Sequence, residues 1–103
     1  MKDVLLKKVK NTVLSIAPDA QVILYGSRSR KDAGPESDWD FLVLTDLMVD
    51  DKLTDTIRHQ LYEIEWETGE ILSVIVRNRK DWNSLPLMTT PFHTNIESEG
   101  MPL

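Results

Sequence analysis

The sequence predicts a single domain of the α/β or α+β class that spans residues 1–103. Segments with helical periodicity alternate with short strand-like apolar runs along the whole chain. No internal repeat, low-complexity stretch or linker separates them. The length, with 41% hydrophobic and 28% charged residues, suits one folded domain and rules out a second.

Four elements are expected in the first half of the chain. Residues 4–16 have apolar side chains at steps of three and four, which predicts an amphipathic helix. Pro18 ends it, because proline disfavours helical geometry in the residue before it. Residues 21–25 are rich in β-branched and aromatic side chains, as in a buried strand that Gly26 closes. About two turns of helix are expected over residues 27–33, and a second strand over residues 38–44.

The second half repeats this alternation. An apolar stripe from Leu53 to Ile64 predicts another helix, which ends at Thr68 and Gly69. Residues 70–77 are so apolar that a third strand, buried on both faces, is expected. A helical turn near Trp82 and a final helix over residues 91–98 complete the prediction.

Composition excludes several classes of protein. Seventeen acidic and twelve basic residues give a net charge of -5. This charge argues against a protein that binds nucleic acid mainly through a basic surface. With no cysteine there are no disulfides, thiolate metal sites or cysteine nucleophiles. We expect no membrane span and no signal peptide, because apolar runs are short and the first residues are charged. A cytoplasmic protein is therefore expected.

The stretch between the first two predicted strands contains the residues best suited to chemistry. Gly26 and Ser27 follow the first strand, and Asp38-Trp39-Asp40 opens the second after ten residues. Alternate strand residues share a face, so the Asp38 and Asp40 carboxylates can converge on one hard cation, Mg²⁺ or Mn²⁺. Gly26 allows a close backbone approach, and Ser27 offers a hydroxyl and an N–H to phosphate.

A short basic run follows this glycine and serine. Arg28, Arg30 and Lys31 place three cations within four residues of a net-acidic chain. Arg28 and Arg30 are candidate phosphate partners, although surface salt bridges explain Arg30 almost as well. Together with Asp38 and Asp40 they predict a site that holds a triphosphate and its metal ion, as phosphoryl and nucleotidyl transfer require.

This arrangement resembles the minimal nucleotidyltransferases of the DNA polymerase beta superfamily, whose signature is Gly-Ser, ten residues and Asp-x-Asp. The resemblance implies an α+β fold in which a small mixed sheet carries helices mainly on one face. It also implies Gly26 and Ser27 at the triphosphate, and Asp38 and Asp40 as catalytic metal ligands. A third carboxylate usual in that family falls at Ser73, which is a poor Mg²⁺ ligand and no general base. Glu70 would replace it only through a bulge in the third strand.

Two functions follow from these observations. The first is an Mg²⁺-dependent nucleotidyltransferase that moves a nucleoside monophosphate from an NTP, most plausibly ATP, to a hydroxyl of an acceptor. In the family the acceptor is often a HEPN protein, a helical toxin for which the minimal nucleotidyltransferase is the antitoxin. The alternative is a non-catalytic module of the same fold that binds a nucleotide or a partner protein. In this interpretation Ser73, at the position of the third carboxylate, has weakened catalysis. A homo-oligomer remains open.

The remaining candidates are assigned to structure. His59 and His93 are expected to be solvated surface residues, because neither has a partner at a spacing suited to zinc. Four aromatic residues are expected to pack or to be partly exposed rather than to stack on a base: Tyr62, Trp66, Trp82 and Phe92.

Overall fold

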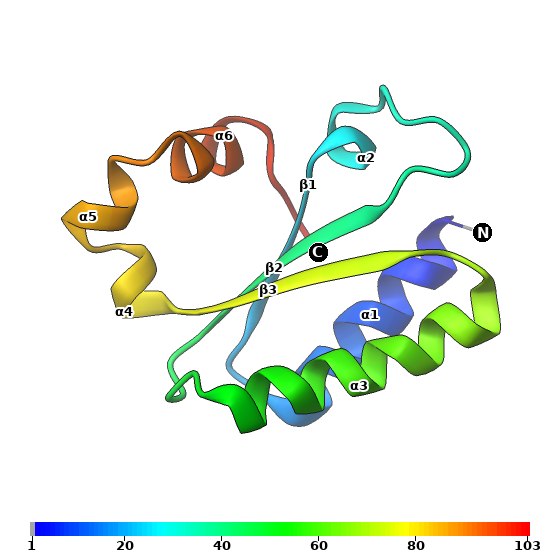
Figure 1. Cartoon of the computed structure of the whole chain (residues 1–103), viewed down its shortest axis with the longest axis horizontal. Coiled ribbons are helices and arrows are strands. Elements are labelled where there is room, and N and C mark those ends of the chain that lie inside the picture. The colour runs from blue at the N-terminus through cyan, green and yellow to red at the C-terminus, as the bar shows by residue number, and fades with distance from the viewer. Residues whose placement is uncertain (1) are drawn as a thin grey trace.

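The computed structural model describes residues 2–103, whose strands form one four-stranded sheet in the order β3-β2-β1-β4 (Figure 1). Its elements in chain order are α1 (Lys2–Ile16), β1 (Gln21–Tyr25), α2 (Ser27–Arg30), β2 (Trp39–Thr45), α3 (Asp51–Thr68), β3 (Leu72–Asn78), α4 (Arg79–Trp82), α5 (Leu85–Met88), α6 (Pro91–Glu99) and β4 (Met101–Pro102).

The sheet is mixed. β1 runs antiparallel to both β2 and β4, and β2 runs parallel to β3. The parallel pair needs a crossover, which α3 supplies, whereas the antiparallel pair is joined by α2 and a loop. This is the predicted α+β fold.

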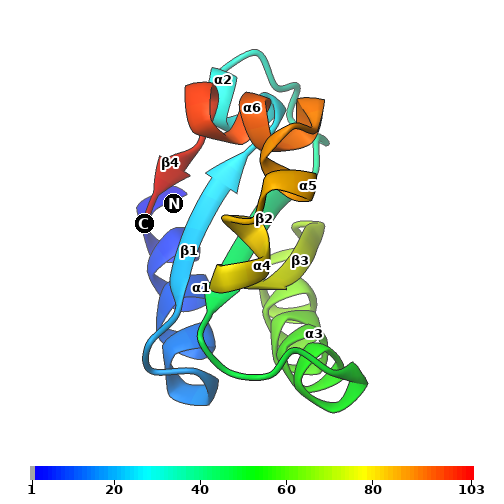
Figure 2. The same ribbon diagram turned by 90° about the vertical axis from the view of Figure 1, so that its left-hand side faces the viewer.

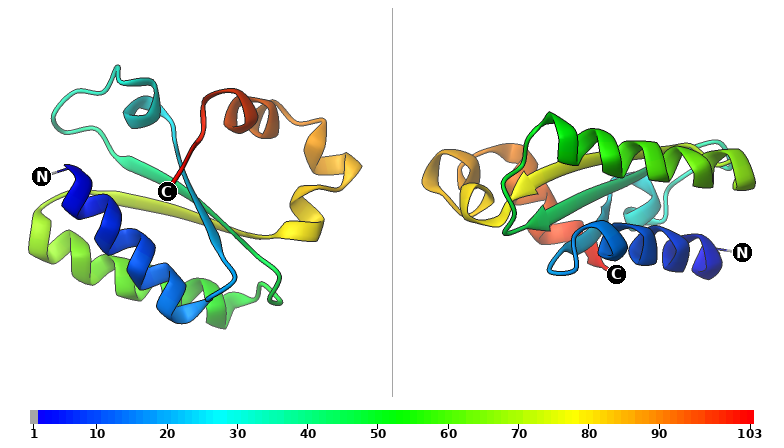
Figure 3. Two further views of the ribbon diagram at one scale, coloured as in Figure 1. Left: turned by 180° about the vertical axis from the view of Figure 1, so that it is seen from behind. Right: turned by 90° about the horizontal axis from the view of Figure 1, so that it is seen from below.

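One face of the sheet is covered by α1 and α3, which lie side by side (Figures 2 and 3). The apolar stripe of α3 packs there through Ile57, Leu61 and Ile64. From β2, the alternate residues Trp39, Phe41 and Val43 point into the same cluster. This layer is the larger part of the hydrophobic core, and it fixes which side of β2 faces away from the helices.

The opposite face has a smaller apolar cluster, formed by Ile23, Leu42, Leu44, Trp82 and Ile96. Trp82 of α4 and Ile96 of α6 cover this side of the sheet. His93 of α6 stacks on Trp82, with ring centroids 4.4 Å apart, and is only 6% exposed. The expectation of a solvated His93 was therefore wrong, because its ring completes this packing. His59 is exposed, as predicted.

The structure corrects three further expectations. The helix after β1 is one turn, not two, because Lys31 adopts a left-handed conformation with φ 64°. β3 is an edge strand with only partial burial on the α6 side, so it is not buried on both faces. Neither α5 nor β4 was predicted. The strand boundaries also shift, so that Asp38 lies just before β2.

A hydrogen-bonded group around Asp19 closes the end of the sheet remote from Gly26. The Asp19 carboxylate accepts the N–H of Asp46 at 2.6 Å and the hydroxyl of buried Thr45 at 2.9 Å. Arg79 lies beside it and pairs with Asp46 at 2.6 Å. These bonds join the α1–β1 turn to the end of β2. Across residues 2–103, no helix is long and apolar enough to cross a membrane.

Replacing Asp19 tests this closure. The Asp46 N–H is the main reason why the pKa of Asp19 lies below its ordinary value of 3.8. A lowered pKa stabilises the fold above pH 3.8 and the gain is lost as pH falls through the folded-state pKa. We expect Asp19→Asn to lose about 1 kcal/mol of unfolding free energy at pH 7, measured by urea denaturation. The difference from wild type should close as pH falls below 3.8 and through the folded-state pKa, and equal stability at pH 7 would contradict this role.

Candidate functional site

The antiparallel pairing of β1 and β2 brings together the two halves of the predicted motif. Tyr25, the last residue of β1, pairs with Asp40, the second residue of β2. Gly26 continues from β1 and therefore lies beside Asp40. The glycine-serine turn and the Asp-x-Asp segment meet at one end of the sheet, as the sequence predicted.

Gly26 and the Asp40 carboxylate lie in close contact. Gly26 has φ 76°, which L side chains rarely adopt, and a Cβ built on it would lie 2.5 Å from Asp40 Oδ2. Both the backbone conformation and the neighbouring oxygen therefore require a residue without a side chain. The result is a carboxylate held against bare backbone at the start of α2.

Asp38 and Asp40 form an interacting acidic pair. Burial of the half-exposed Asp40 raises its pKa above the ordinary value, and the nearby Asp38 carboxylate raises it further. Arg30 acts in the opposite direction on the Asp40 pKa. Burial is the larger of the two causes that raise the Asp40 pKa. A cation bound here would relieve both effects.

Ser27 opens α2 directly after Gly26. The Gly26 carbonyl accepts the N–H groups of Ser29 and Arg30, each at 3.1 Å, which closes the single turn. The Ser29 hydroxyl donates to the carbonyl of Glu99, at the end of α6. The turn that presents Ser27 is thus anchored to a helix far along the chain (Figure 1).

Arg28 is engaged within the protein. Its guanidinium donates to the Ser37 carbonyl at 3.0 Å and to the Pro35 carbonyl at 3.3 Å. It also lies over the Trp39 ring, 4.3 Å from the ring centroid, and its side chain is 17% exposed. Arg28 therefore holds the loop that leads into Asp38, a role that the sequence did not reveal. Its predicted contact with phosphate is untested.

Arg30 is more open. Its guanidinium donates to Asp32 at 3.2 Å and to Glu99 at 3.1 Å, both on the surface. These are the surface salt bridges that the sequence left as an alternative. Its effect on the pKa of Asp40 places Arg30 near the acidic pair, so a phosphate role stays a prediction.

The residue beside Asp40 on the next strand is Ser73. The parallel register of β2 and β3 pairs these two residues, and it continues from Trp39 to Thr45 without a bulge. Glu70 lies before β3, where it accepts the Trp39 indole N–H at 3.0 Å and faces Arg28 at 3.8 Å. Glu70 therefore does not lie beside Asp40, whereas Ser73 does.

The acidic pair suits a hard cation that also has oxygen ligands from a nucleotide. Within the described range 2–103, no group of three or more acidic, histidine or cysteine side chains is gathered to hold a metal alone. Mg²⁺ is commonly bound by one or two carboxylates together with substrate phosphates and water. Asp38 and Asp40 supply such a pair next to the Gly26 turn, so the residues present fit this cation.

Comparison with known proteins places the chain in a family. The family model for the nucleotidyltransferase domain matches residues 6–98. The chain belongs to the nucleotidyltransferase domain family. A search of curated protein sequences gives no match.

Three solved structures that superpose on this chain are of toxin–antitoxin proteins. A toxin–antitoxin crystal structure with AMP-PNP superposes with a TM-score of 0.65 at 15% identity, covering 93% of this chain and 69% of that chain. A mutant toxin–antitoxin MntA-HpeT gives 0.66 at 13% identity, with 93% and 69% covered. The complex of tri-AMPylated Shewanella oneidensis HEPN toxin with MNT antitoxin gives 0.64 at 14%, with 99% and 71% covered. At these identities the likeness establishes the nucleotidyltransferase-like fold.

The contact between Gly26 and Asp40 can be tested by adding one methyl group. Gly26→Ala would place Cβ against Asp40 Oδ2 in a backbone conformation unfavourable to alanine. We expect about 1–3 kcal/mol of destabilisation, measured by thermal or urea unfolding. Gly34→Ala is the matched control, because its Cβ would meet only Ser37 Oγ at 3.9 Å. Equal stability of the two variants would show that the close approach does not exist.

Proposed function

We propose that this protein is a divalent-metal-dependent nucleotidyltransferase that moves a nucleoside monophosphate from an NTP to a hydroxyl group of a partner protein. The observation that carries the proposal is the Asp40 carboxylate held against the Gly26 backbone, with Asp38 beside it. A metal ion at these carboxylates and a phosphate group at the Gly26 turn would then be neighbours. Membership of the nucleotidyltransferase domain family supports the same reaction class.

The roles of the residues follow from their chemistry. Asp38 and Asp40 would hold Mg²⁺ or Mn²⁺, which when bound polarises phosphoryl oxygens and offsets developing negative charge. Gly26 lets the nucleotide approach the backbone, and Ser27 offers its hydroxyl and N–H to the terminal phosphates. Arg30, the more exposed arginine beside the acidic pair, is available to a phosphate once it leaves Asp32 or Glu99.

The partner is proposed from the neighbouring structures. These are toxin–antitoxin structures, one with AMP-PNP and one of a tri-AMPylated HEPN toxin in complex with an MNT antitoxin. ATP as donor and a HEPN-type helical protein as acceptor are therefore the substrates that we propose for this chain. An acceptor supplied by another protein is also consistent with the small size of the domain.

One observation favours a second candidate function. Ser73 pairs with Asp40 where the family resemblance predicts a third carboxylate, and a serine hydroxyl cannot act as general base at neutral pH. With two carboxylates, a metal–nucleotide complex can still bind while transfer is slow. The alternative is therefore a module of the same fold that binds nucleotide and partner and inhibits the partner by contact.

Binding of Mg²⁺ and ATP together should stabilise the folded protein. At ten times the dissociation constant the expected gain is about 1.4 kcal/mol, or roughly 6–11 °C in melting temperature for a domain of this size. Asp40→Asn should abolish that increment and lower pyrophosphate release by about 100-fold or more, because losing even a residue that only orients a metal ligand costs up to about that factor. Because the pKa of Asp40 is raised, the ligand-free variant should also melt slightly above wild type.

Asp55→Asn is the matched control for that measurement, since Asp55 is exposed on α3. It should keep both the ligand-induced shift and the pyrophosphate release measured with a partner present. Wild type that shows no shift with Mg²⁺ and ATP would rule out the metal–nucleotide site. A shift without any release would favour the binding module.

Ser73→Asp would place a third carboxylate beside Asp40. Because Ser73 shares the face of Asp40, the new carboxylate would lie in the acidic site and should tighten Mn²⁺ binding at least tenfold, measured by calorimetry. Val74→Asp, one residue along, points into the helix-covered core and should instead destabilise the fold by several kcal/mol. Faster pyrophosphate release in Ser73→Asp than in a nearly inert wild type would identify the chain as a catalytically weakened member of the family.

A further inference from the structure

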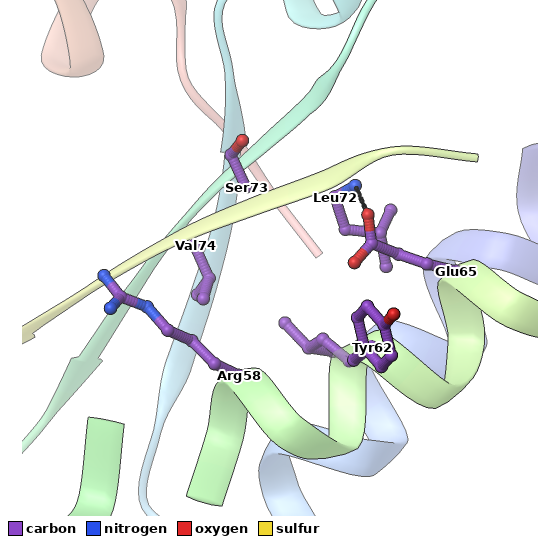
Figure 4. Close-up of a pocket in the computed structure, with 7 residues that line it drawn as sticks. Arg58, Tyr62, Glu65, Leu72, Ser73 and Val74 are labelled. Carbon is purple, nitrogen blue, oxygen red and sulfur yellow. Dashed lines mark hydrogen bonds between the residues drawn. The ribbon is translucent and has the colours of Figure 1, made fainter. Parts of the chain in front are cut away.

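A groove runs between α3 and the outer edge of β3, on the face of the sheet away from Asp40 (Figure 4). We call it the α3–β3 groove; it has a volume of about 370 Å³ and is lined by Arg58, Leu61, Tyr62, Glu65, Leu72, Ser73 and Val74. Figure 4 shows Val74 and Leu72 pointing toward α3, whereas Ser73 points away from it. The groove is thus separate from the proposed nucleotide site.

The edge of β3 beside this groove is open. In the part of the chain that the structure describes, β3 has β2 on one side and no strand on the other. The Ile71 carbonyl accepts the N–H of Trp39, so Ile71 and every second residue after it direct their backbone groups at β2. The alternate residues Leu72, Val74 and Val76 direct theirs outward, where an unpaired edge is a template for another strand.

Two of these outward groups are already bonded to side chains. Glu65 accepts the N–H of Leu72 at 3.0 Å, and Arg77 donates to the carbonyl of Val76 at 3.1 Å. The groups left for a neighbouring strand are the Leu72 carbonyl, both groups of Val74 and the N–H of Val76. This set has the symmetry of a two-fold axis at Val74.

From this symmetry we infer that the open edge of β3 pairs with β3 of a second copy of this chain. In an antiparallel pair centred on Val74, each Val74 N–H donates to the other Val74 carbonyl, and each Val76 N–H donates to the Leu72 carbonyl opposite. Leu72 N–H and Val76 C=O of opposite copies also face each other in this pair, so the Glu65 carboxylate and the Arg77 guanidinium leave these two groups when the strands pair. The two sheets join into one, with an isologous interface.

The charges on α3 fit the same symmetry. Glu65 lies beside Leu72 and Arg58 lies beside Val74, at opposite ends of the α3–β3 groove (Figure 4). Reversing the strand direction across the axis therefore brings Glu65 of one copy near Arg58 of the other. Neither side chain forms an ion pair within residues 2–103, and strand pairing releases Glu65 from the Leu72 N–H, so both can pair across the interface.

Large apolar side chains are exposed around the groove. Tyr62 and Trp66 form an edge-to-face pair on α3 and are 51% and 73% exposed. Ile71, at the start of the same edge, is 52% exposed. Aromatic residues of this kind are enriched in protein interfaces. A second copy adds its own Tyr62 and Trp66, so that both pairs are buried together.

Sedimentation velocity across a protein concentration series tests the inference on the unmodified chain. An ionic strength of about 0.15 M screens the repulsion between two copies of charge -5. We expect a reversible dimer, with hydrogen exchange at the Val74 and Val76 amides slowing as dimer forms. Arg58→Glu and Glu65→Lys should each weaken association about tenfold, because each opposes like charges at two symmetric places. The double variant Arg58→Glu/Glu65→Lys should restore it.

The matched controls reverse charge on α3 outside the groove. Lys52→Glu and Glu63→Lys should leave the association constant unchanged. A chain that stays monomeric at all concentrations, with the Val74 and Val76 amides unprotected, would overturn the inference. So would a dimer that the controls weaken as much as the groove variants, or one that the double variant does not restore. If a variant fails to fold, the amide exchange of the wild type still decides.

Discussion

The candidate site depends on the lack of a side chain at Gly26. Because β1 and β2 are antiparallel neighbours, the turn after β1 must pass the second residue of β2, and that residue is a carboxylate. Only glycine combines φ 76° with an approach that leaves no space for Cβ. Asp40 is partly buried, and burial raises its pKa because it disfavours the ionised carboxylate. A bound cation would stabilise that ionised form.

The rest of the site is arranged around that contact by hydrogen bonds over long sequence distances. Arg28 spans from α2 to the carbonyl of Ser37 and so fixes the approach to Asp38. Glu99, at the end of α6, holds both the Ser29 hydroxyl and the Arg30 guanidinium. The single turn of α2 has too few residues to be stable alone, so these bonds determine its position. Arg28 and Arg30, which the sequence predicts as phosphate partners, therefore also hold the backbone around Gly26 and Asp38 in position.

Sequence patterns were sufficient where local physics decides structure. The apolar stripes gave α1 and α3, and the spacing from Gly26 to Asp40 gave the meeting of the two motif halves. They failed where tertiary context decides. An apolar run does not distinguish a central strand from an edge strand, so the exposure of β3 was missed. His93 looked solvated because its stacking on Trp82 depends on how α4 and α6 meet. The one-turn α5 and two-residue β4 are too short to show a period.

The period of two along β3 explains how one strand serves two surfaces. Ser73 and Ile75 lie on the face of Asp40, where the register makes Ser73 the neighbour of the acidic pair. Leu72 and Val74 lie on the helix-covered face and direct their backbone groups to the open edge. A shift of one residue in register would exchange these sets and place a valine beside Asp40. The unbroken pairing with β2 therefore fixes the acidic site and the free edge together.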